Sequence, residues 1–220
     1  MEIYNSIVQF FQQGGVFMYP IMVVLALGLA IALERYIYLS YAGARNRSTW
    51  DRVMPLIQAG KYDEARAYAE NSRTAISKVL SYGLRRLGIS RKRDDIEMAM
   101  EEGLMEVVPR VEKRTHYLAT LANIATLLGL LGTIIGLIEA FTAVASANPA
   151  ERADMLSASI SVAMNTTAFG LMVGIPLLLI HAVLQTKSTQ LVDSLEMASV
   201  KVLNLINGAQ PQPQTQEALA

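Results

Sequence analysis

The 220-residue sequence contains no cysteine, which excludes a disulfide framework and a thiolate metal site. Charge is also scarce, because Asp, Glu, Lys and Arg make up 17% of the chain against roughly 25% in an ordinary soluble domain. The 19 basic residues are balanced by 19 carboxylates, so the sequence gives little support to nucleic-acid binding. The scarcity is uneven along the chain, which predicts a protein divided between lipid and water.

Motifs for common enzyme chemistry are absent as well. Gly60-Lys61 is followed by Tyr62 without the glycine spacing of a phosphate-binding loop, and no Gly-x-Ser-x-Gly sequence occurs. His116 and His181 have no ligand pattern nearby. We therefore expect neither nucleotide hydrolysis, nor an active site, nor a resident cofactor. Any work the protein does would draw on the gradient across a membrane.

Three long stretches without Asp, Glu, Lys or Arg, at 3–33, 117–138 and 155–180, dominate the sequence. A membrane-spanning helix needs about 20 apolar residues. We predict transmembrane helices at 16–39, 117–144 and 155–185. Buried helices of a soluble protein are the alternative, but little water-soluble sequence remains to cover them. Because no basic segment precedes the first stretch, we expect it to stay in the mature protein.

The basic residues predict the orientation in the membrane. Sixteen of the 19 lie between Arg35 and Arg114, none precedes them, and Arg152 alone lies between the second and third spans. Cytoplasmic segments of membrane proteins carry the excess of Lys and Arg. We expect the N-terminus and a loop at 145–154 to face the periplasm, and the C-terminus to face the cytoplasm.

The cytoplasmic segment at 40–116 is predicted to be a helical domain, because its apolar residues recur every three or four positions. Gly60 and Gly88 separate its helices. The helix that we expect to begin at Asp94 has no clear stop signal before the second span. The pattern therefore predicts one continuous helix from there to Val144.

The two ends of the chain have their own patterns. Residues 1–15 suit a short helix lying in the membrane interface, with a frayed terminus as the alternative. Residues 186–207 continue the third span as an amphipathic cytoplasmic helix. The Pro- and Gln-rich residues 208–220 are predicted to be disordered.

Small residues recur on one side of the second and third spans. Such stripes let helix backbones approach closely, within one subunit or between several. The residues assigned to helix packing are Gly129, Gly132, Gly136, Gly170, Gly174 and Pro176.

Polar residues also lie inside these spans, where they are costly. Thr133 lies in the middle of the second span, and Asn165, Thr166 and Thr167 lie in the first half of the third. Intramembrane polar groups tend to face a partner or a water-filled path. Two interpretations stay open at this point, a polar pathway lining and internal packing.

At these residues the sequence resembles the MotA/TolQ/ExbB family, and most closely ExbB and TolQ. Residues 17–20 (Phe-Met-Tyr-Pro), 130–136 (Leu-Leu-Gly-Thr-Ile-Ile-Gly) and 167–171 (Thr-Ala-Phe-Gly-Leu) resemble the family's three spans in turn. Length and the cytoplasmic loop are similar too, so the resemblance covers nearly the whole chain.

The resemblance implies an all-α, polytopic subunit of a pentamer in the bacterial inner membrane. The pentamer would enclose single helices from two copies of an ExbD/TolR-like partner, whose intramembrane Asp binds the translocated cation. Cation binding and release would drive rotation, and the periplasmic part of the partner would transmit force, with a TonB-like protein as a further partner. Thr133 and Thr167 match the family threonines that line the pathway beside that Asp.

The sequence departs from the family at Val162, where ExbB and TolQ usually carry a Glu. Our hypothesis is that the partner's Asp alone provides the charge. Thr133, Thr166, Thr167 and Asn165 would supply neutral oxygen ligands, which suit a transient Na⁺ near the three threonines as well as a hydrated proton path. The alternative is a non-conducting membrane scaffold that presents a cytoplasmic helical hairpin to partners. An intramembrane enzyme has no acid, base or nucleophile set to support it.

Overall fold

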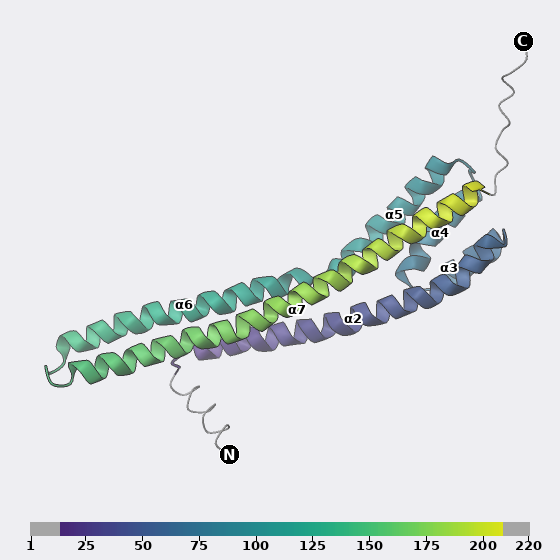
Figure 1. Cartoon of the computed structure of the whole chain (residues 1–220). Coiled ribbons are helices and arrows are strands. Elements are labelled where there is room, and N and C mark those ends of the chain that lie inside the picture. Colours follow the sequence, from purple (N-terminus) through teal and green to yellow (C-terminus); the bar gives the residue numbers. More distant parts are fainter. Residues whose placement is uncertain (1–13, 209–220) are drawn as a thin grey trace, which may run out of the picture. The chain divides into compact units, whose positions relative to one another are not determined.

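A computed structural model describes residues 14–208, and every element in that range is a helix (Figure 1). The helices are α2 (Met18–Gln58), α3 (Tyr62–Asn71), α4 (Ala75–Leu87), α5 (Arg93–Glu112), α6 (Thr115–Ser146) and α7 (Arg152–Gly208). The all-α class is therefore confirmed. The interfacial helix expected at 1–15, apart from its last two residues, and the tail expected after 208 lie outside the described residues.

Three helical segments are long and apolar enough to cross a membrane, namely α2, the part of Arg93–Ser146 that forms α6, and α7. Their outer faces carry large exposed apolar side chains, such as Leu27 at 52% and Leu179 at 64%. A helix in lipid satisfies its backbone internally and presents apolar side chains outward. The prediction of three transmembrane helices is confirmed.

The chain divides into two compact units. Within the described range, the membrane unit comprises residues 14–36 together with Arg114–Gln185, and the helical unit comprises Ile37–Lys113 together with residues 186–208. α2 and α7 each continue from one unit into the other as unbroken helices.

In the membrane unit, α6 packs on α7 at backbone contact. A Cβ atom on Gly170 would lie 2.7 Å from the carbonyl oxygen of Ala125 and 2.9 Å from the Cα of Gly129. A Cβ on Gly129 would in turn lie 3.2 Å from the Cα of Thr167. Backbone atoms cannot move aside as a flexible side chain can. These glycines therefore set the closest approach of two helices within one chain.

The rest of the stripe follows the same seam. A Cβ on Gly136 would lie 2.9 Å from the Cβ of Ala163, and one on Gly174 would lie 2.6 Å from the Oγ1 of Thr126. Pro176 lies inside α7 two residues after Gly174, and the helix continues through it.

The continuous helix expected from Asp94 to Val144 is wrong, because the chain breaks between α5 and α6. Arg114 adopts a left-handed conformation with φ +66°, which costs a non-glycine residue about 1–2 kcal/mol. Its Nη1 donates to Glu34 Oε2 at 2.8 Å. Both side chains are about half exposed, so this ion pair adds little stability. No glycine or proline marks the break in the sequence.

The helical unit is built on α4, which packs against both α3 and α5. Thr74 and Ser77 form a reciprocal capping box at the start of α4. Each side chain accepts a hydrogen bond from the other residue's backbone N–H, a group that has no partner within the helix. Asn46 Oδ1 accepts the Ile76 N–H at 3.3 Å, which ties this end of α4 to α2. Gly60 makes the tight α2–α3 connection with φ +71°, a conformation that favours glycine.

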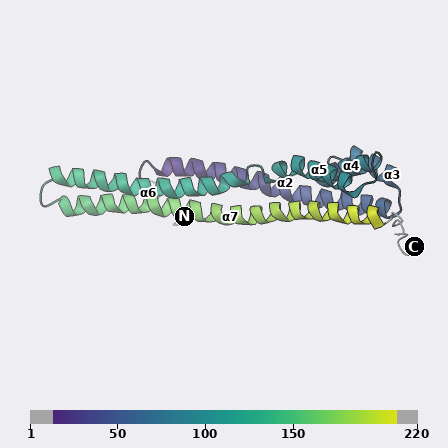
Figure 2. The ribbon, with the colours of Figure 1, turned by 90° about the horizontal axis from the view of Figure 1, so that it is seen from above.

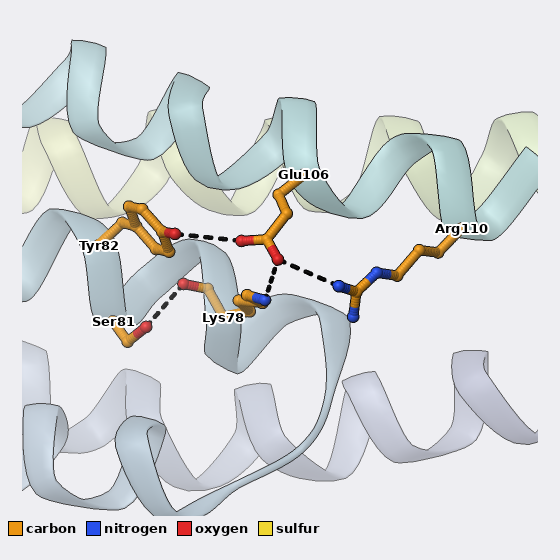
Figure 3. Close-up of polar contacts among 5 residues, drawn as sticks. All are labelled: Lys78, Ser81, Tyr82, Glu106 and Arg110. Atoms are coloured by element: carbon orange, nitrogen blue, oxygen red, sulfur yellow. Dashed lines mark hydrogen bonds and ion pairs between the residues drawn. The ribbon is translucent and has the colours of Figure 1, made fainter.

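One carboxylate accepts from three donors between α4 and α5 (Figure 3). The carboxylate of Glu106 accepts hydrogen bonds from Nζ of Lys78, from the hydroxyl of Tyr82 at 3.1 Å and from Nη2 of Arg110 at 3.1 Å. The hydrogen bond from Lys78 holds the pKa of Glu106 below its ordinary value of 4.5, against the opposing effect of burial. The hydrogen bond to Glu106 raises the pKa of Tyr82 above 10.0.

We predict that Gly170→Val destabilises the membrane unit by about 1–3 kcal/mol, the usual cost of overpacking. The new side chain would meet the backbone of α6, which cannot yield. Thermal unfolding of the purified chain in detergent measures the effect. Gly208→Ala is the control, because a Cβ there meets nothing within 4 Å. Equal melting temperatures for the two variants would contradict the packing described.

We predict a pH-dependent loss of stability in Glu106→Gln. A carboxyl group whose pKa is lowered by folding stabilises the fold above its unfolded pKa and loses that effect as pH falls through the folded value. The deficit of the variant relative to the unchanged chain should therefore be full near pH 7 and shrink below about pH 4.5. Unfolding followed at several pH values tests this. Glu70→Gln, which breaks the exposed pair with Arg66, is the control and should show a smaller deficit.

Candidate functional site

The polar residues predicted to line a pathway all lie in the membrane unit. Thr133 lies on α6, and Asn165, Thr166 and Thr167 occupy consecutive positions on α7. Successive residues of an α-helix point about 100° apart, so these three side chains cannot face one place. The packing of α6 on α7 decides which of them come together.

Thr133 and Thr167 bond to adjacent carbonyls of α6, those of Leu130 and Gly129. The hydroxyl of Thr167 crosses the seam and donates to the carbonyl oxygen of Gly129 at 2.8 Å. That carbonyl lies four residues before Thr133, one turn away on the same helix. Thr133 itself donates to the carbonyl of Leu130 at 2.6 Å. Both threonines are half-buried.

The chemistry of these two hydroxyls follows from where their protons are. A threonine hydroxyl has one proton to donate and two lone pairs to accept with. Both protons are given to backbone carbonyls, so each oxygen presents lone pairs to whatever approaches it. The two hydroxyl oxygens can accept a hydrogen bond from a protonated carboxyl group or act as ligands to a cation.

The side chain of Thr166 is buried inside the subunit. It is 2% exposed, and its Oγ1 lies 2.5 Å from the carbonyl oxygen of Gly14 and 3.0 Å from that of Val162. A Cβ on Gly132 would lie 2.4 Å from its Cγ2 and 3.5 Å from the Cβ of Phe17. The side chain therefore ties α7 to the turn that leads into α2.

Asn165 lies apart from the threonine pair. Two positions separate it from Thr167, which places it about 200° round α7. It is half-buried, and its side chain makes no hydrogen bond to the residues in the range 14–208. The structure does not bring it to the Thr133–Thr167 turn.

Val162, at the position where the resemblance leads us to expect a glutamate, lies beside Gly15 at the turn before α2. Its Cγ1 lies 3.3 Å from where a Cβ on Gly15 would be, and its side chain is half-buried. Within one turn of Thr133 and Thr167 the sequence of α6 and α7 carries no ionisable residue, and Glu139 lies six residues after Thr133 on α6. No cluster of three His, Asp or Glu residues suited to a metal occurs in the described range.

Thr126 is a polar residue at this seam that the sequence analysis missed. It lies seven residues before Thr133, which places both on nearly the same face of α6. Its hydroxyl donates to the carbonyl of Ala122 at 3.1 Å, and it is half-buried beside Gly174. The seven-residue spacing of two threonines in an otherwise apolar helix was the available signal.

Comparison with known proteins agrees with these observations. Residues 71–197 match the profile of the MotA/TolQ/ExbB proton channel family. An ExbB-like protein of Synechocystis is 32% identical over 189 residues, which cover 83% of this chain and 72% of that protein. A protein of Methanothermobacter thermautotrophicus that is named as an ExbB homolog is 28% identical, over 90% of this chain and 69% of its own length. A biopolymer transport protein of the ExbB type from Vibrio cholerae is 29% identical, over 78% and 76%.

We predict that Thr166→Val loosens the start of α2. The substitution keeps the shape of the side chain and removes the donor to Gly14, a loss of about 0.5–1.5 kcal/mol. Hydrogen exchange should accelerate at the N–H groups of Met18 and Tyr19, which pair with the adjoining turn. Thr167→Val is the control and should leave exchange at these two groups unchanged. Unaltered exchange in the Thr166 variant would show that the bond does not hold the turn.

Proposed function

Because the chain belongs to the MotA/TolQ/ExbB proton channel family, we propose that it is the channel subunit of an ion-driven motor. It is an inner-membrane protein, and its relatives carry the names of biopolymer transport proteins. In this proposal, five copies surround single helices from two copies of an ExbD/TolR-like partner. The motor converts an ion-motive force into mechanical work across the envelope, for TonB- or Tol-type transport.

The observation that supports the proposal is the pair of hydroxyls at Thr133 and Thr167, each bonded to a backbone carbonyl, on stretches of α6 and α7 with no charged residue within one turn of either threonine. A carboxylate in a low-dielectric region is costly unless it is hydrogen-bonded. A hydroxyl can accept from a protonated carboxyl group and, after rotation, donate to an ionised one. The pair therefore suits both protonation states of an Asp that a partner helix carries past it.

The proposed energetics are those of charge movement in a field. One charge crossing 100 mV releases about 2.3 kcal/mol, so several ions suffice to bias a mechanical step. Thr133 and Thr167 would contact the partner's carboxyl group or a Na⁺ bound to it. Thr166 is assigned a structural role instead, because its hydroxyl is committed inside the subunit. The N-terminus and residues 147–151 would face the periplasm, and the helical unit would face the cytoplasm.

We predict that Thr133→Val and Thr167→Val each lower ion flux at least about tenfold, since one hydrogen bond to a charged group contributes about 1.5–3 kcal/mol. Flux is measured in proteoliposomes that contain the complex with its single-span partner. Sodium is removed at constant pH in a parallel set. A fall in flux without sodium identifies Na⁺ as the ion, and unchanged flux excludes a sodium requirement.

The matched control is Thr142→Val. Thr142 also donates to its own helix, at 2.8 Å, but lies nine residues from Thr133 and hence on the opposite side of α6. Flux should survive in this variant. The size of the complex must be unchanged in all three variants. Full flux in both pathway variants, with function lost only on changes in the α3–α4 hairpin, would favour a non-conducting scaffold instead.

A further inference from the structure

Two open grooves flank α7 in the helical unit. The first, of about 510 Å³, lies between α7 and the C-terminal part of α2, and the second, of about 560 Å³, lies between α7 and α5. α5 lies next to α7 in Figure 1, and the axes of the two helices are nearly aligned in the turned view of Figure 2. Apolar side chains contribute to both grooves, including Trp50 and Leu191 in the first and Leu104 and Val108 in the second.

The charges around the two grooves are opposite. Arg47, Lys187 and Lys201 line the first groove, and no carboxylate does. Glu97, Glu101 and Glu196 line the second groove, and no basic residue does. Each groove therefore combines an apolar surface with charge of one sign, which makes the two complementary to each other.

Four of these charged side chains have no ion-pair partner in the described part of the subunit. Arg47 and Lys201 at the first groove and Glu101 and Glu196 at the second are all exposed, and none forms a salt bridge there. Glu97 differs, because Arg93 lies 3.5 Å from it. The first groove thus offers two cations, and the second offers two carboxylates.

The grooves lie on roughly opposite sides of α7. Lys187, Ser194 and Lys201 follow one another at seven-residue spacing along the first groove, and Glu196 and Leu203 do so along the second. At 100° per residue the two sets are centred about 170° apart. The two grooves of one copy cannot meet each other, whereas the grooves of two copies can.

The charged residues also lie at matching heights along α7. Lys187 donates to Ser40 at 3.4 Å, so Arg47, seven residues further along α2, lies level with Ser194. Ser188 donates to the Val111 carbonyl at 3.3 Å, and α5 runs antiparallel to α7.

Glu101, ten residues before Val111, is consequently level with residue 198. At 1.5 Å per residue, the four unpaired charges occupy a band about 10 Å tall. Copies that cross one membrane in the same sense are related by an axis along the membrane normal, so contacting residues keep the same height.

We propose that the second-groove face of one copy docks into the first groove of the next copy, with Glu101 and Glu196 facing Arg47 and Lys201. Such a contact uses two different surfaces, and it closes into a ring when the rotation between copies allows. It would also cover the exposed side chains of Met197, Val200 and Met105. The inference deepens the assembly part of the proposed function and supplies the surfaces that hold the ring together.

Charge reversal tests the pairing. Arg47→Glu with Lys201→Glu, or Glu101→Lys with Glu196→Lys, should each weaken association between copies at least about tenfold, because like charges then face each other. All four substitutions in one chain should restore the assembly, with the charges exchanged. Mass is measured by light scattering on the purified full chain in detergent. Reversing the exposed Lys61–Glu64 pair is the control and should leave assembly unchanged.

A second measurement does not depend on the stability of these variants. Because the chain has no cysteine, Arg47→Cys together with Glu101→Cys introduces the only two thiols, one in each groove. Oxidation of membranes should then give a ladder of cross-linked multimers. Either substitution alone should give no ladder, since its thiol faces a groove that carries none.

The outcomes separate the two proposals. Reversed variants that assemble normally, or an Arg47→Cys chain that cross-links to itself, would overturn the docking surfaces. A third result would also overturn them. In it, the chain with all four substitutions fails to assemble, and only the Arg47→Glu, Lys201→Glu variant loses a co-purifying anionic lipid. A ring that cross-links as proposed yet conducts no ions with its partner would uphold the interface and refute the ion channel.

Discussion

The backbone contact between α6 and α7 is the constraint on which the membrane unit depends. At Gly129 and Gly170 the backbones of the two helices approach so closely that no side chain larger than the hydrogen atom of glycine fits between them. This approach lets the Thr167 hydroxyl reach a carbonyl of α6, next to the turn that carries Thr133. The glycines therefore act indirectly on function. They let a hydroxyl of α7 bond to the turn of α6 that precedes Thr133.

The sequence predicted the parts of the fold that depend on solvent. Long charge-free stretches can be accommodated only in lipid, which is why three spanning helices could be predicted and were found. The break between α5 and α6 could not be predicted, because Arg114 adopts its left-handed conformation beside Glu34, 80 positions earlier in the sequence. A contact that distant in sequence leaves no mark on local periodicity.

The candidate site shows the same limit. The sequence places the four candidate residues within the spans, but the directions of their side chains depend on the packing of α6 against α7. Thr166 and Thr167 are neighbours in sequence, yet one bonds to the turn before α2 and the other bonds across to α6. The grooves of the helical unit were equally invisible in the sequence, because each is formed by α7 and a helix from a different part of the chain.

The left-handed residue between α5 and α6 has a mechanical consequence. A continuous α-helix transmits torsion along its axis, whereas two residues outside helical geometry form a joint that can swivel. α2 and α7 continue without interruption between the two units, and the α5–α6 connection does not. If the proposed motor generates torque among the spans, two continuous helices would carry it to the helical unit. The α5–α6 connection, where Arg114 bonds to Glu34, would not carry it along a helix axis.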